Sequence, residues 1–293
     1  MRTFEALLKE GTGILEKSGN QEAGLDAWLL LEYTINKNRA WYYAHMGAPA
    51  AEQEADRYLK LCRRRARHIP LQHLTQQAFF MGYEFYVDEH VLIPRQDTEI
   101  LAEEALRCLK ELESPRILDM CTGSGCILLS ILAEKQGCTG IGADISPEAL
   151  AVAKRNAVSL GVQKRAVFAE SDIFTGKYFQ EKDGKEPGKY DILISNPPYI
   201  PTGEMQGLME EVRLHDPGLA LDGREDGLYF YRVITAQSRR YLKPGGWLLY
   251  EIGCSQGAKV SDMMKAVGFQ RVAVKQDLSG LDRVVMGQSP AEI

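Results

Sequence analysis

The sequence lacks the closely spaced cysteines and histidines that metal sites and disulfide frameworks need. Its six cysteines include no C-x-x-C pair, and its five histidines are scattered along the chain. Zinc sites and disulfide-rich folds show tighter spacings than these. We therefore expect reduced thiols that are mostly buried, and no metal ion.

Long apolar runs are missing as well. Charged residues interrupt the first ten positions, so we expect no signal peptide. The apolar stretch 126–133 is far shorter than a membrane-spanning helix. These absences predict a soluble, cytoplasmic protein with no membrane partner.

An excess of basic charge is the third absence. The net charge is -5, and the isoelectric point is about 5.7. A protein that holds a nucleic-acid backbone normally has a basic balance, so we expect no direct nucleic-acid contact. The basic run 62–68 is interpreted as the solvated face of a helix, with a contact surface for an acidic partner or RNA as the alternative.

What is present is enough for a sizeable core. The chain has 293 residues, of which 45% are hydrophobic. Residues 1–76 show helical spacing of apolar residues, with a break at 47–50, and predict a small all-α domain. Aromatic and β-branched residues between 79 and 93 predict a β-hairpin linker over 77–97.

From residue 98 to residue 293, short apolar strands alternate with helical patterns. This alternation predicts a doubly wound α/β domain with a mostly parallel, seven-stranded sheet. The last two strands are joined by only a turn and should be antiparallel neighbours. The polar stretch 175–189 is interpreted as a surface loop. The predicted strands are 116–120, 140–145, 166–171, 191–195, 247–252, 271–275 and 284–287. The predicted helices are 98–112, 125–136, 147–160, 226–241 and 256–267.

A loop of small residues follows the first of these strands. It contains Gly123 and Gly125, but Leu128 stands where a dinucleotide-binding loop has its third glycine. A P-loop ending in Gly-Lys-Ser/Thr is also absent. The loop therefore fits a nucleotide-like ligand without a pyrophosphate, and a bare tight turn is the alternative. The candidate contacts are Cys121, Thr122, Gly123, Ser124 and Gly125.

Two further strand ends carry polar residues on the same edge of the sheet. Asp144 can accept hydrogen bonds from ribose hydroxyls, because Ser146 is the better helix cap and Pro147 suits the first helical position. Asp172 can meet an adenine amino group, and Ile173 can cover the ring. Ligands of α/β domains bind at this carboxyl edge.

The most specific signal is Asn196-Pro197-Pro198-Tyr199, which closes the fourth strand. Two prolines cannot continue the strand, and they remove two N–H donors. Carbonyl groups and the Asn196 oxygen can then hold both hydrogens of a planar –NH2 group, on which Tyr199 can stack. A rigid turn without a ligand is the alternative.

An amide –NH2 nitrogen is a poor nucleophile, and Asn196 does not titrate near neutral pH. We therefore expect catalysis by positioning the nitrogen in line with a methyl sulfonium and by polarising the –NH2 group. The proton leaves after the transfer.

These residues resemble those of class I methyltransferases that act on planar –NH2 nitrogens, which include DNA N-methyltransferases and protein glutamine methyltransferases. Over nearly its whole length, the chain resembles the release-factor glutamine N5-methyltransferase family (HemK/PrmC-like). The segments that carry this resemblance, in the family's order, are residues 69–75, 92–99, 196–201, 220–223, 226–232, 244–256 and 277–285.

The resemblance implies a helical substrate-recognition domain, a hairpin linker and a Rossmann-like methyltransferase domain. It implies S-adenosylmethionine as methyl donor, with S-adenosylhomocysteine as product, and the glutamine of a Gly-Gly-Gln motif in class 1 release factors as substrate. The implied cofactor contacts are Cys121 to Gly125, Asp144, Ile173 and Asn196, and Asn196 to Tyr199 would contact the glutamine. Cys121 departs from the family, which usually has a glycine there, and residues 214–217 depart from a usual Glu-Pro pair.

Three rival functions stay open. A DNA or RNA amino-methyltransferase would need a basic face and a region that recognises the target. A methyltransferase for a ribosomal-protein glutamine is opposed by the P-R-x-x-T-E element at 94–99 and by Ile200-Pro201. A catalytically silent adaptor is opposed by the intact Asn-Pro-Pro-Tyr. Nothing in the sequence demands more than a monomer.

Overall fold

The computed structural model describes residues 2–180 and 188–291, and they form two compact units. The helical unit comprises Met1–Gln77 and Met209–His215, and the sheet unit comprises Ala78–Leu208 and Asp216–Ile293. The short segment Met209–His215 therefore departs from the expectation that 98–293 forms one continuous domain. It groups with the helical unit although it lies far along the chain.

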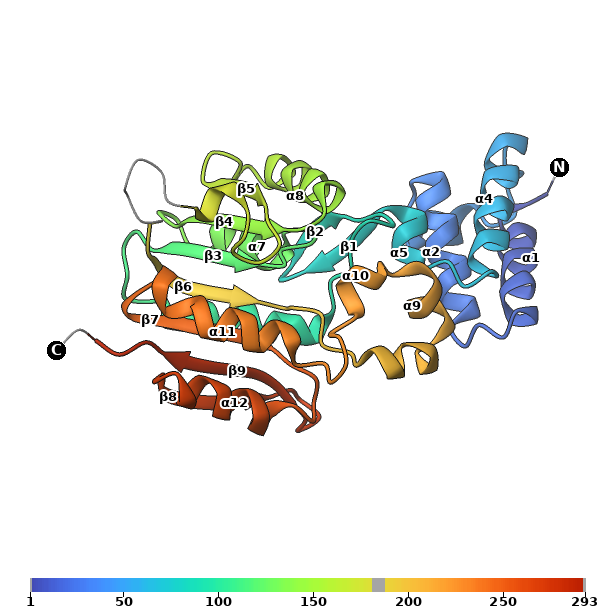
Figure 1. Cartoon of the computed structure of the whole chain (residues 1–293). Coiled ribbons are helices and arrows are strands. Elements are labelled where there is room, and N and C mark those ends of the chain that lie inside the picture. The colour runs from blue at the N-terminus through green and yellow to red at the C-terminus, as the bar shows by residue number, and fades with distance from the viewer. Residues whose placement is uncertain (1, 181–187, 292–293) are drawn as a thin grey trace. The chain divides into compact units, whose positions relative to one another are not determined.

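The helical unit is built around a core of large apolar side chains. Leu31 and Tyr58 are fully buried in it, and Trp28 is nearly so. Local chemistry sets the helix starts, since Thr3 accepts a hydrogen bond from the Ala6 N–H at the first helix. The helices are α1 (Phe4–Lys17), α2 (Ala23–Ile35), α3 (Arg39–His45), α4 (Glu52–Arg65), α5 (Leu71–Thr75) and α9 (Glu210–His215) (Figure 1).

The basic run 62–68 divides into two kinds of residue. Arg63 and Arg64 are exposed, as expected for a solvated helix face. Arg65 is instead mostly buried: its Nε lies 2.7 Å from Asp26 Oδ2, and its Nη1 lies 2.8 Å from Glu211 Oε2. These two ion pairs link α4 to α2 and to α9, so Arg65 is a structural residue of the helical unit.

A two-stranded hairpin precedes the main sheet. It consists of β1 (Gln77–Phe80) and β2 (Tyr83–Tyr86). Phe80 and Phe85 are fully buried, in the cluster that also contains the helices after residue 98. The backbone N–H of Met81 donates to Glu99 Oε1 over 2.6 Å. The hairpin turn is thus tied to the first helix of the sheet unit.

The sheet unit contains the predicted seven-stranded sheet, with strand order β5-β4-β3-β6-β7-β9-β8. The strands from β5 to β7 are parallel, and β9 is antiparallel to both β7 and β8. The fold class and the antiparallel final pair are confirmed. The strands are β3 (Arg116–Met120), β4 (Thr139–Asp144), β5 (Ala166–Glu170), β6 (Tyr190–Ser195), β7 (Leu242–Glu251), β8 (Gln270–Gln276) and β9 (Asp282–Gln288).

Strand β7 begins five residues before its predicted start at 247. Leu242 pairs with Tyr190 and Trp247 pairs with Ile192, so a bulge absorbs the residues between them. The bulge holds Gly245 at φ +74° and Gly246 against the Tyr190 and Asp191 carbonyls. The Pro-Gly-Gly sequence hides this extension, because it is typical of a turn.

Helices cover both faces of the sheet (Figure 1). Side chains of α6, α7 and α8 pack with Ile117 and Ile192 on one face, whereas those of α11 and α12 pack with Leu118 and Leu193 on the other. Alternate strand residues face opposite layers, as parallel sheets require. The helices are η1 (Gln96–Thr98), α6 (Glu99–Cys108), α7 (Cys126–Glu134), α8 (Pro147–Ser159), η2 (Lys177–Phe179), η3 (Thr202–Gly207), α10 (Gly218–Leu221), α11 (Tyr229–Tyr241) and α12 (Gly257–Ala266).

The stretch 175–189 was expected to be a surface loop, and residues 181–187 of it lie outside the described residues. Its described part includes a buried residue. Phe179 is 2% exposed and packs edge-on against Phe174 and Tyr241. Among the described residues, no helix is both long and apolar enough to cross a bilayer.

Candidate active site

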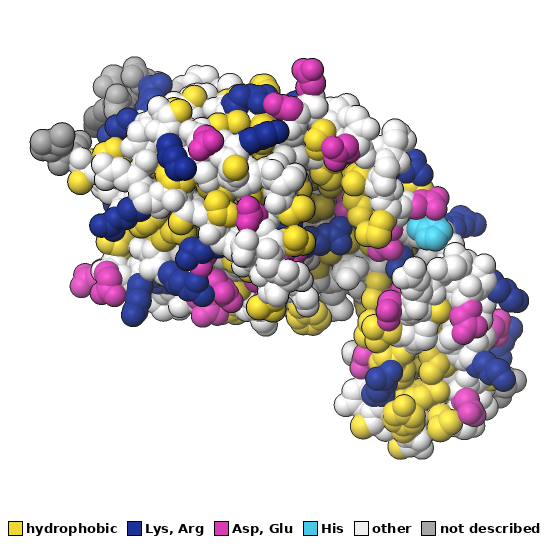
Figure 2. Space-filling view, turned by 90° about the horizontal axis from the view of Figure 1, so that it is seen from below, with side chains coloured by type: hydrophobic (Ala, Val, Ile, Leu, Met, Phe, Trp, Pro, Cys, Tyr) yellow, Lys and Arg dark blue, Asp and Glu magenta, His cyan; other side chains and the backbone are white. Residues whose placement is uncertain are grey.

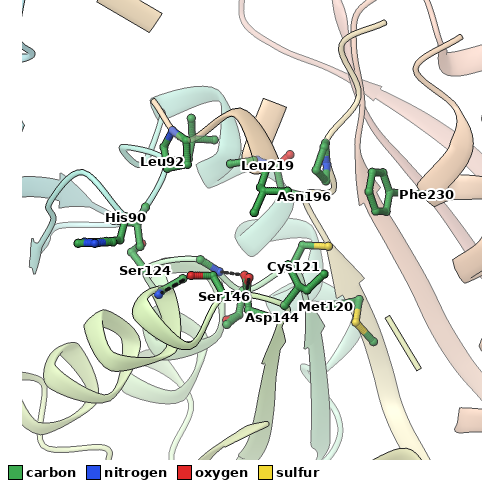
Figure 3. A pocket seen from close by; sticks show the side chains of 18 of the residues that line it. His90, Leu92, Met120, Cys121, Ser124, Asp144, Ser146, Asn196, Leu219 and Phe230 are labelled. Carbon is green, nitrogen blue, oxygen red and sulfur yellow. Dashed lines mark hydrogen bonds between the residues drawn. The ribbon is translucent and has the colours of Figure 1, made fainter. Parts of the chain in front are cut away.

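A pocket of about 580 Å³ lies at the carboxyl ends of β3, β4, β5 and β6, within the sheet unit. Its size falls in the usual range for small-molecule sites, roughly 300–1,000 Å³. Figure 3 shows Cys121 between Asp144 on one side and Asn196 on the other. The predicted site residues that line the pocket are Cys121, Thr122, Gly123, Ser124, Asp144, Asp172, Ile173, Asn196 and Pro198.

The loop after β3 is shaped by a buried carboxyl group. Asp119 is fully buried, and its Oδ2 accepts a hydrogen bond of 2.6 Å from the Thr122 hydroxyl. Burial raises the pKa of Asp119 to about 7, against the lowering effect of Thr122. Gly125 has φ +80°, and an added Cβ would lie 2.9 Å from Leu129 Cδ1. Gly125 therefore supports the turn from behind and does not line the pocket.

Cys121 adopts the left-handed backbone conformation, with φ +61°. This conformation costs a residue with a Cβ roughly 1–2 kcal/mol. Burial also raises the pKa of its thiol well above the usual range, so the thiol stays protonated. The chain thus tolerates a side chain where the resembling family usually has glycine, at a cost in backbone strain.

The variant Cys121→Gly is expected to keep its free energy of unfolding within about 1 kcal/mol, because relief of strain offsets the lost side chain. The variant Cys121→Val places a β-branched residue at the same φ and should lose about 2 kcal/mol. Urea denaturation of both variants measures the difference. Equal stability of the two variants would show that the backbone at Cys121 relaxes.

Asp144 ends β4 and is held by two backbone donors. Its Oδ2 accepts from the Gly123 N–H (2.9 Å), and its Oδ1 accepts from the Ser146 N–H (3.0 Å). Burial raises the pKa of its carboxyl group, against the lowering effect of these donors. The Ser146 hydroxyl caps α8 by accepting from the Ala149 N–H. The carboxylate still has acceptor capacity for a ligand hydroxyl.

The turn after β5 is strained at the pocket wall. Ile173 has φ +52°, which is rare for a β-branched residue. The Ser171 hydroxyl holds this conformation, because it donates to the Ile173 carbonyl (2.6 Å) and accepts from the Gly176 N–H (2.8 Å). Ile173 is mostly buried, whereas Asp172 is exposed at the pocket. Strain of this kind persists where the surrounding structure imposes it.

The Asn-Pro-Pro-Tyr segment follows β6. Asn196 and Pro198 line the pocket, and Pro197 and Tyr199 do not. Among the described residues, the carbonyls of Pro197 and Pro198 accept no hydrogen bond, so they remain available as acceptors. The Tyr199 ring instead packs against the core on the α11 side, and burial raises its pKa to about 12.

A glutamine side chain locks the backbone of this segment. Gln256 Nε2 donates to the carbonyls of Tyr199 (3.0 Å) and Gly227 (3.2 Å), and its Oε1 accepts from the Gly253 N–H (2.9 Å). An added Cβ at Gly227 would lie 2.3 Å from the backbone carbonyl oxygen of Tyr199. Gln256 and Gly227 therefore fix where the catalytic segment runs.

Three residues of the P-R-x-x-T-E element, Arg95, Thr98 and Glu99, each contact a different part of the sheet unit. Arg95 Nη2 lies 2.9 Å from the buried carboxylate of Asp216. Thr98 lies beside the Glu251 carboxyl group and lowers its pKa. Glu99 accepts from the Met81 N–H at the hairpin turn. The P-R-x-x-T-E element thus joins the hairpin, a pocket wall and strand β7.

Other pocket residues were not foreseen from the sequence. They come from the segment after β2 and from the residues around α10 and α11. Several of them are aliphatic or aromatic, and such residue types do not by themselves indicate a pocket. Those labelled in Figure 3 are His90, Leu92, Leu219 and Phe230.

The strand order and the position of the pocket define the chain as a class I methyltransferase. A family described as "Methyltransferase domain" matches residues 112–279, and one described as "PrmC N-terminal domain" matches residues 6–75.

The "Release factor glutamine methyltransferase" of Clostridium acetobutylicum is 35% identical over 98% of both chains. That of Cereibacter sphaeroides is 39% identical over 99% of this chain and 100% of its own. The chain belongs to the release factor glutamine methyltransferase family. Among solved structures, the release-factor-specific protein-(glutamine-N5) methyltransferase of Alicyclobacillus acidocaldarius is 29% identical, with TM-score 0.41 over 70% of this chain and 99% of that one.

Proposed function

We propose that this enzyme transfers a methyl group from S-adenosylmethionine to the side-chain amide nitrogen of the glutamine in the Gly-Gly-Gln motif of class 1 release factors. The observation that carries this proposal is that Asn196 and Pro198 line the same pocket as the Cys121 loop and Asp144. A group that holds a planar –NH2 therefore lies in one cavity with a nucleoside-type site. The names of the relatives give a release factor glutamine as their target, which supports this proposal.

The residues of the pocket fit this cofactor. Asp144 has acceptor capacity for ribose hydroxyls, Asp172 is exposed beside Ile173, and the small-residue loop from Cys121 permits close approach of the backbone. Gly125 supports that loop from behind. S-adenosylmethionine supplies an electrophilic methyl group on a sulfonium.

The chain's own residues act on the substrate amide. The Asn196 side-chain oxygen and the carbonyl of Pro198, two residues that line the pocket, are acceptors for the two –NH2 hydrogens. Accepting both hydrogens orients the nitrogen lone pair and favours the positive charge that grows on nitrogen. Tyr199 contributes by packing behind the segment, since its ring faces the core and not the pocket.

The protein substrate and its recognition follow from the same proposal. The helical domain, 1–76, recognises the release factor, and the hairpin 77–97 links it to the catalytic domain, which is 98–293 without Met209–His215. The enzyme works as a cytoplasmic monomer. Nucleic acid is a weaker candidate, since on the face in Figure 2 basic side chains lie among acidic ones. A net charge of -5 agrees with this choice.

The variant Asn196→Ala is expected to lower methylation of a purified class 1 release factor by about 100-fold, since it removes an acceptor that acts on the transition state. Labelled methyl groups from S-adenosylmethionine, mapped by mass spectrometry, measure the loss. The control Gln270→Ala removes an exposed amide outside the pocket and should retain full activity. Label on a ribosomal protein or on DNA, with none on the Gly-Gly-Gln glutamine, would overturn the proposed substrate.

A further inference from the structure

A buried carboxyl group lies directly beside the catalytic segment. Ser195, the last residue of β6, pairs with Tyr250 of β7. Asn196 follows directly after β6, and Glu251 is the last residue of β7. Glu251 is 3% exposed, and its own carbonyl accepts a hydrogen bond of 2.9 Å from the Tyr231 hydroxyl. Glu251 and Asn196 thus follow a matched pair, and their side chains interact.

The Glu251 carboxyl group is not explained by a structural ion pair. Its Oε2 is buried and accepts no hydrogen bond from the described residues. The nearby Arg283 lies 3.1 Å from Asp97 and 3.1 Å from Asp277, so its ion pairs are made with other carboxylates. A buried acceptor without a donor is costly, and such a group in a folded protein calls for a role.

The side chains that adjoin Glu251 belong to the pocket wall. Thr98 and Asn196 both line the pocket, and both lower the pKa of the Glu251 carboxyl group. Thr98 stands at the N-terminus of α6, but its side chain makes no capping hydrogen bond there. Its hydroxyl group is thus available to Glu251. The carboxyl group connects the β7 strand end to two residues that face the ligand.

An asparagine amide has an acceptor end and a donor end of nearly the same shape. Only the oxygen of Asn196 can hold a substrate –NH2 hydrogen, so the amide must be fixed with its oxygen toward the pocket. An ionised carboxylate accepts hydrogen bonds and donates none. Placed beside the amide, it favours the orientation in which Nδ2 faces the carboxylate.

We infer that Glu251 is a positioning residue for methyl transfer, which as an ionised carboxylate orients the Asn196 amide so that Oδ1 faces the substrate –NH2 group. The inference rests on the proposed function, because it concerns the same glutamine-binding site. Glu251 itself does not line the pocket and acts through Asn196.

Its charge state gives the inference a pH dependence. Burial raises the pKa of Glu251 to about 7, although Thr98, Arg283 and Asn196 oppose the shift. Below this pH the protonated carboxyl can donate to Oδ1 and turn the amide away, so kcat falls as pH decreases through about 7. The titratable and charged groups that face Glu251 from the surrounding elements are Asp97, Arg283, Tyr199, Tyr231 and Cys126.

The variant Glu251→Gln tests the inference, because glutamine has the same shape and can donate as well as accept. Methylation of a Gly-Gly-Gln release factor is measured between pH 5.5 and 9. We expect kcat to fall about tenfold at pH 8, with KM for S-adenosylmethionine unchanged. We also expect the acid limb of the pH profile, which is the fall in kcat as pH decreases through about 7, to disappear. Wild-type kcat together with an unchanged acid limb in Glu251→Gln would overturn the inference.

The variant Asp97→Asn is the matched control. Asp97 is half-exposed, does not line the pocket and raises the pKa of Glu251. Removing its charge should leave the maximal kcat within twofold and move the acid limb to lower pH. An acid limb that stays in place would show that it does not belong to Glu251.

Stability and binding separate this role from a folding defect. An ionised, buried Glu251 destabilises the fold above its raised pKa, so the Tm of Glu251→Gln at pH 8 should equal or exceed that of the wild type. Binding of S-adenosylhomocysteine should be unchanged by calorimetry. A lower Tm with weakened binding would assign Glu251 a structural role. A wild-type enzyme without activity on the release factor would instead refute the proposed function, whatever Glu251 does.

Discussion

Replacing Gly227 with alanine is expected to reduce glutamine methylation by more than 100-fold and to lower the free energy of unfolding by about 3 kcal/mol. The new Cβ would lie 2.3 Å from the backbone carbonyl oxygen of Tyr199 and 2.9 Å from Gln256 Nε2. The backbone at Gly227 also has φ +71°, which alanine adopts only under strain. Either the Asn196–Tyr199 segment moves or the Gln256 clamp breaks, and both displace Asn196.

The control for this experiment is Gly161→Ala. Gly161 has a similar φ of +69°, but an added Cβ meets nothing within 4 Å. This variant measures strain alone, about 1 kcal/mol, and should keep its activity. Methylation assays and urea denaturation of the two variants separate strain from displacement. Equal activity of Gly227→Ala and Gly161→Ala would show that the catalytic segment does not depend on the close approach at Gly227.

Residue patterns predicted the sheet because each strand carries its own apolar run. Strand β3 has the predicted bounds, β5 and β6 differ by one residue at one end, and β4 is shifted by one residue at both ends. The predicted helix at 226 begins instead at Tyr229. The Asp226 carboxylate accepts from the Leu228 N–H, and Gly227 is left-handed, so the chain turns before the helix starts. That turn follows from the contact with Tyr199, which no local pattern contains.

In the candidate site too, residues set by local pattern were predicted, and residues set by long-range contacts were not. The Cys121 loop, Asp144 and Asn196 were predicted because each lies at the end of a strand, and ends of parallel strands meet at one edge. The pairs Gln256–Tyr199 and Arg95–Asp216 join residues 57 and 121 positions apart. A single sequence holds no signal for such partners. The prediction that the Tyr199 ring stacks on the ligand fails for the same reason. The core residues that surround the ring are far from it in the sequence.

Asn156 is the second residue whose loss should have a large effect. It is 1% exposed on α8, and its Nδ2 donates to the carbonyls of Tyr86 (3.0 Å) and Ser124 (2.9 Å). Its Oδ1 accepts from the Tyr86 N–H over 2.8 Å. One side chain therefore satisfies three backbone groups, two in the hairpin and one in the loop after β3.

The variant Asn156→Leu is expected to lose about 4 kcal/mol of unfolding free energy, because three backbone groups near the core lose their partner, at roughly 1–3 kcal/mol each before relaxation. Lys154→Leu, at an exposed position of the same helix, should stay within about 0.5 kcal/mol of the wild type. Urea denaturation measures both. The Ser124 carbonyl belongs to the loop that lines the pocket, so the variant should also bind S-adenosylhomocysteine more weakly at temperatures where it remains folded. Unchanged affinity in a destabilised protein would mean that the loop holds its shape through Asp119 and Thr122 alone, without support from α8.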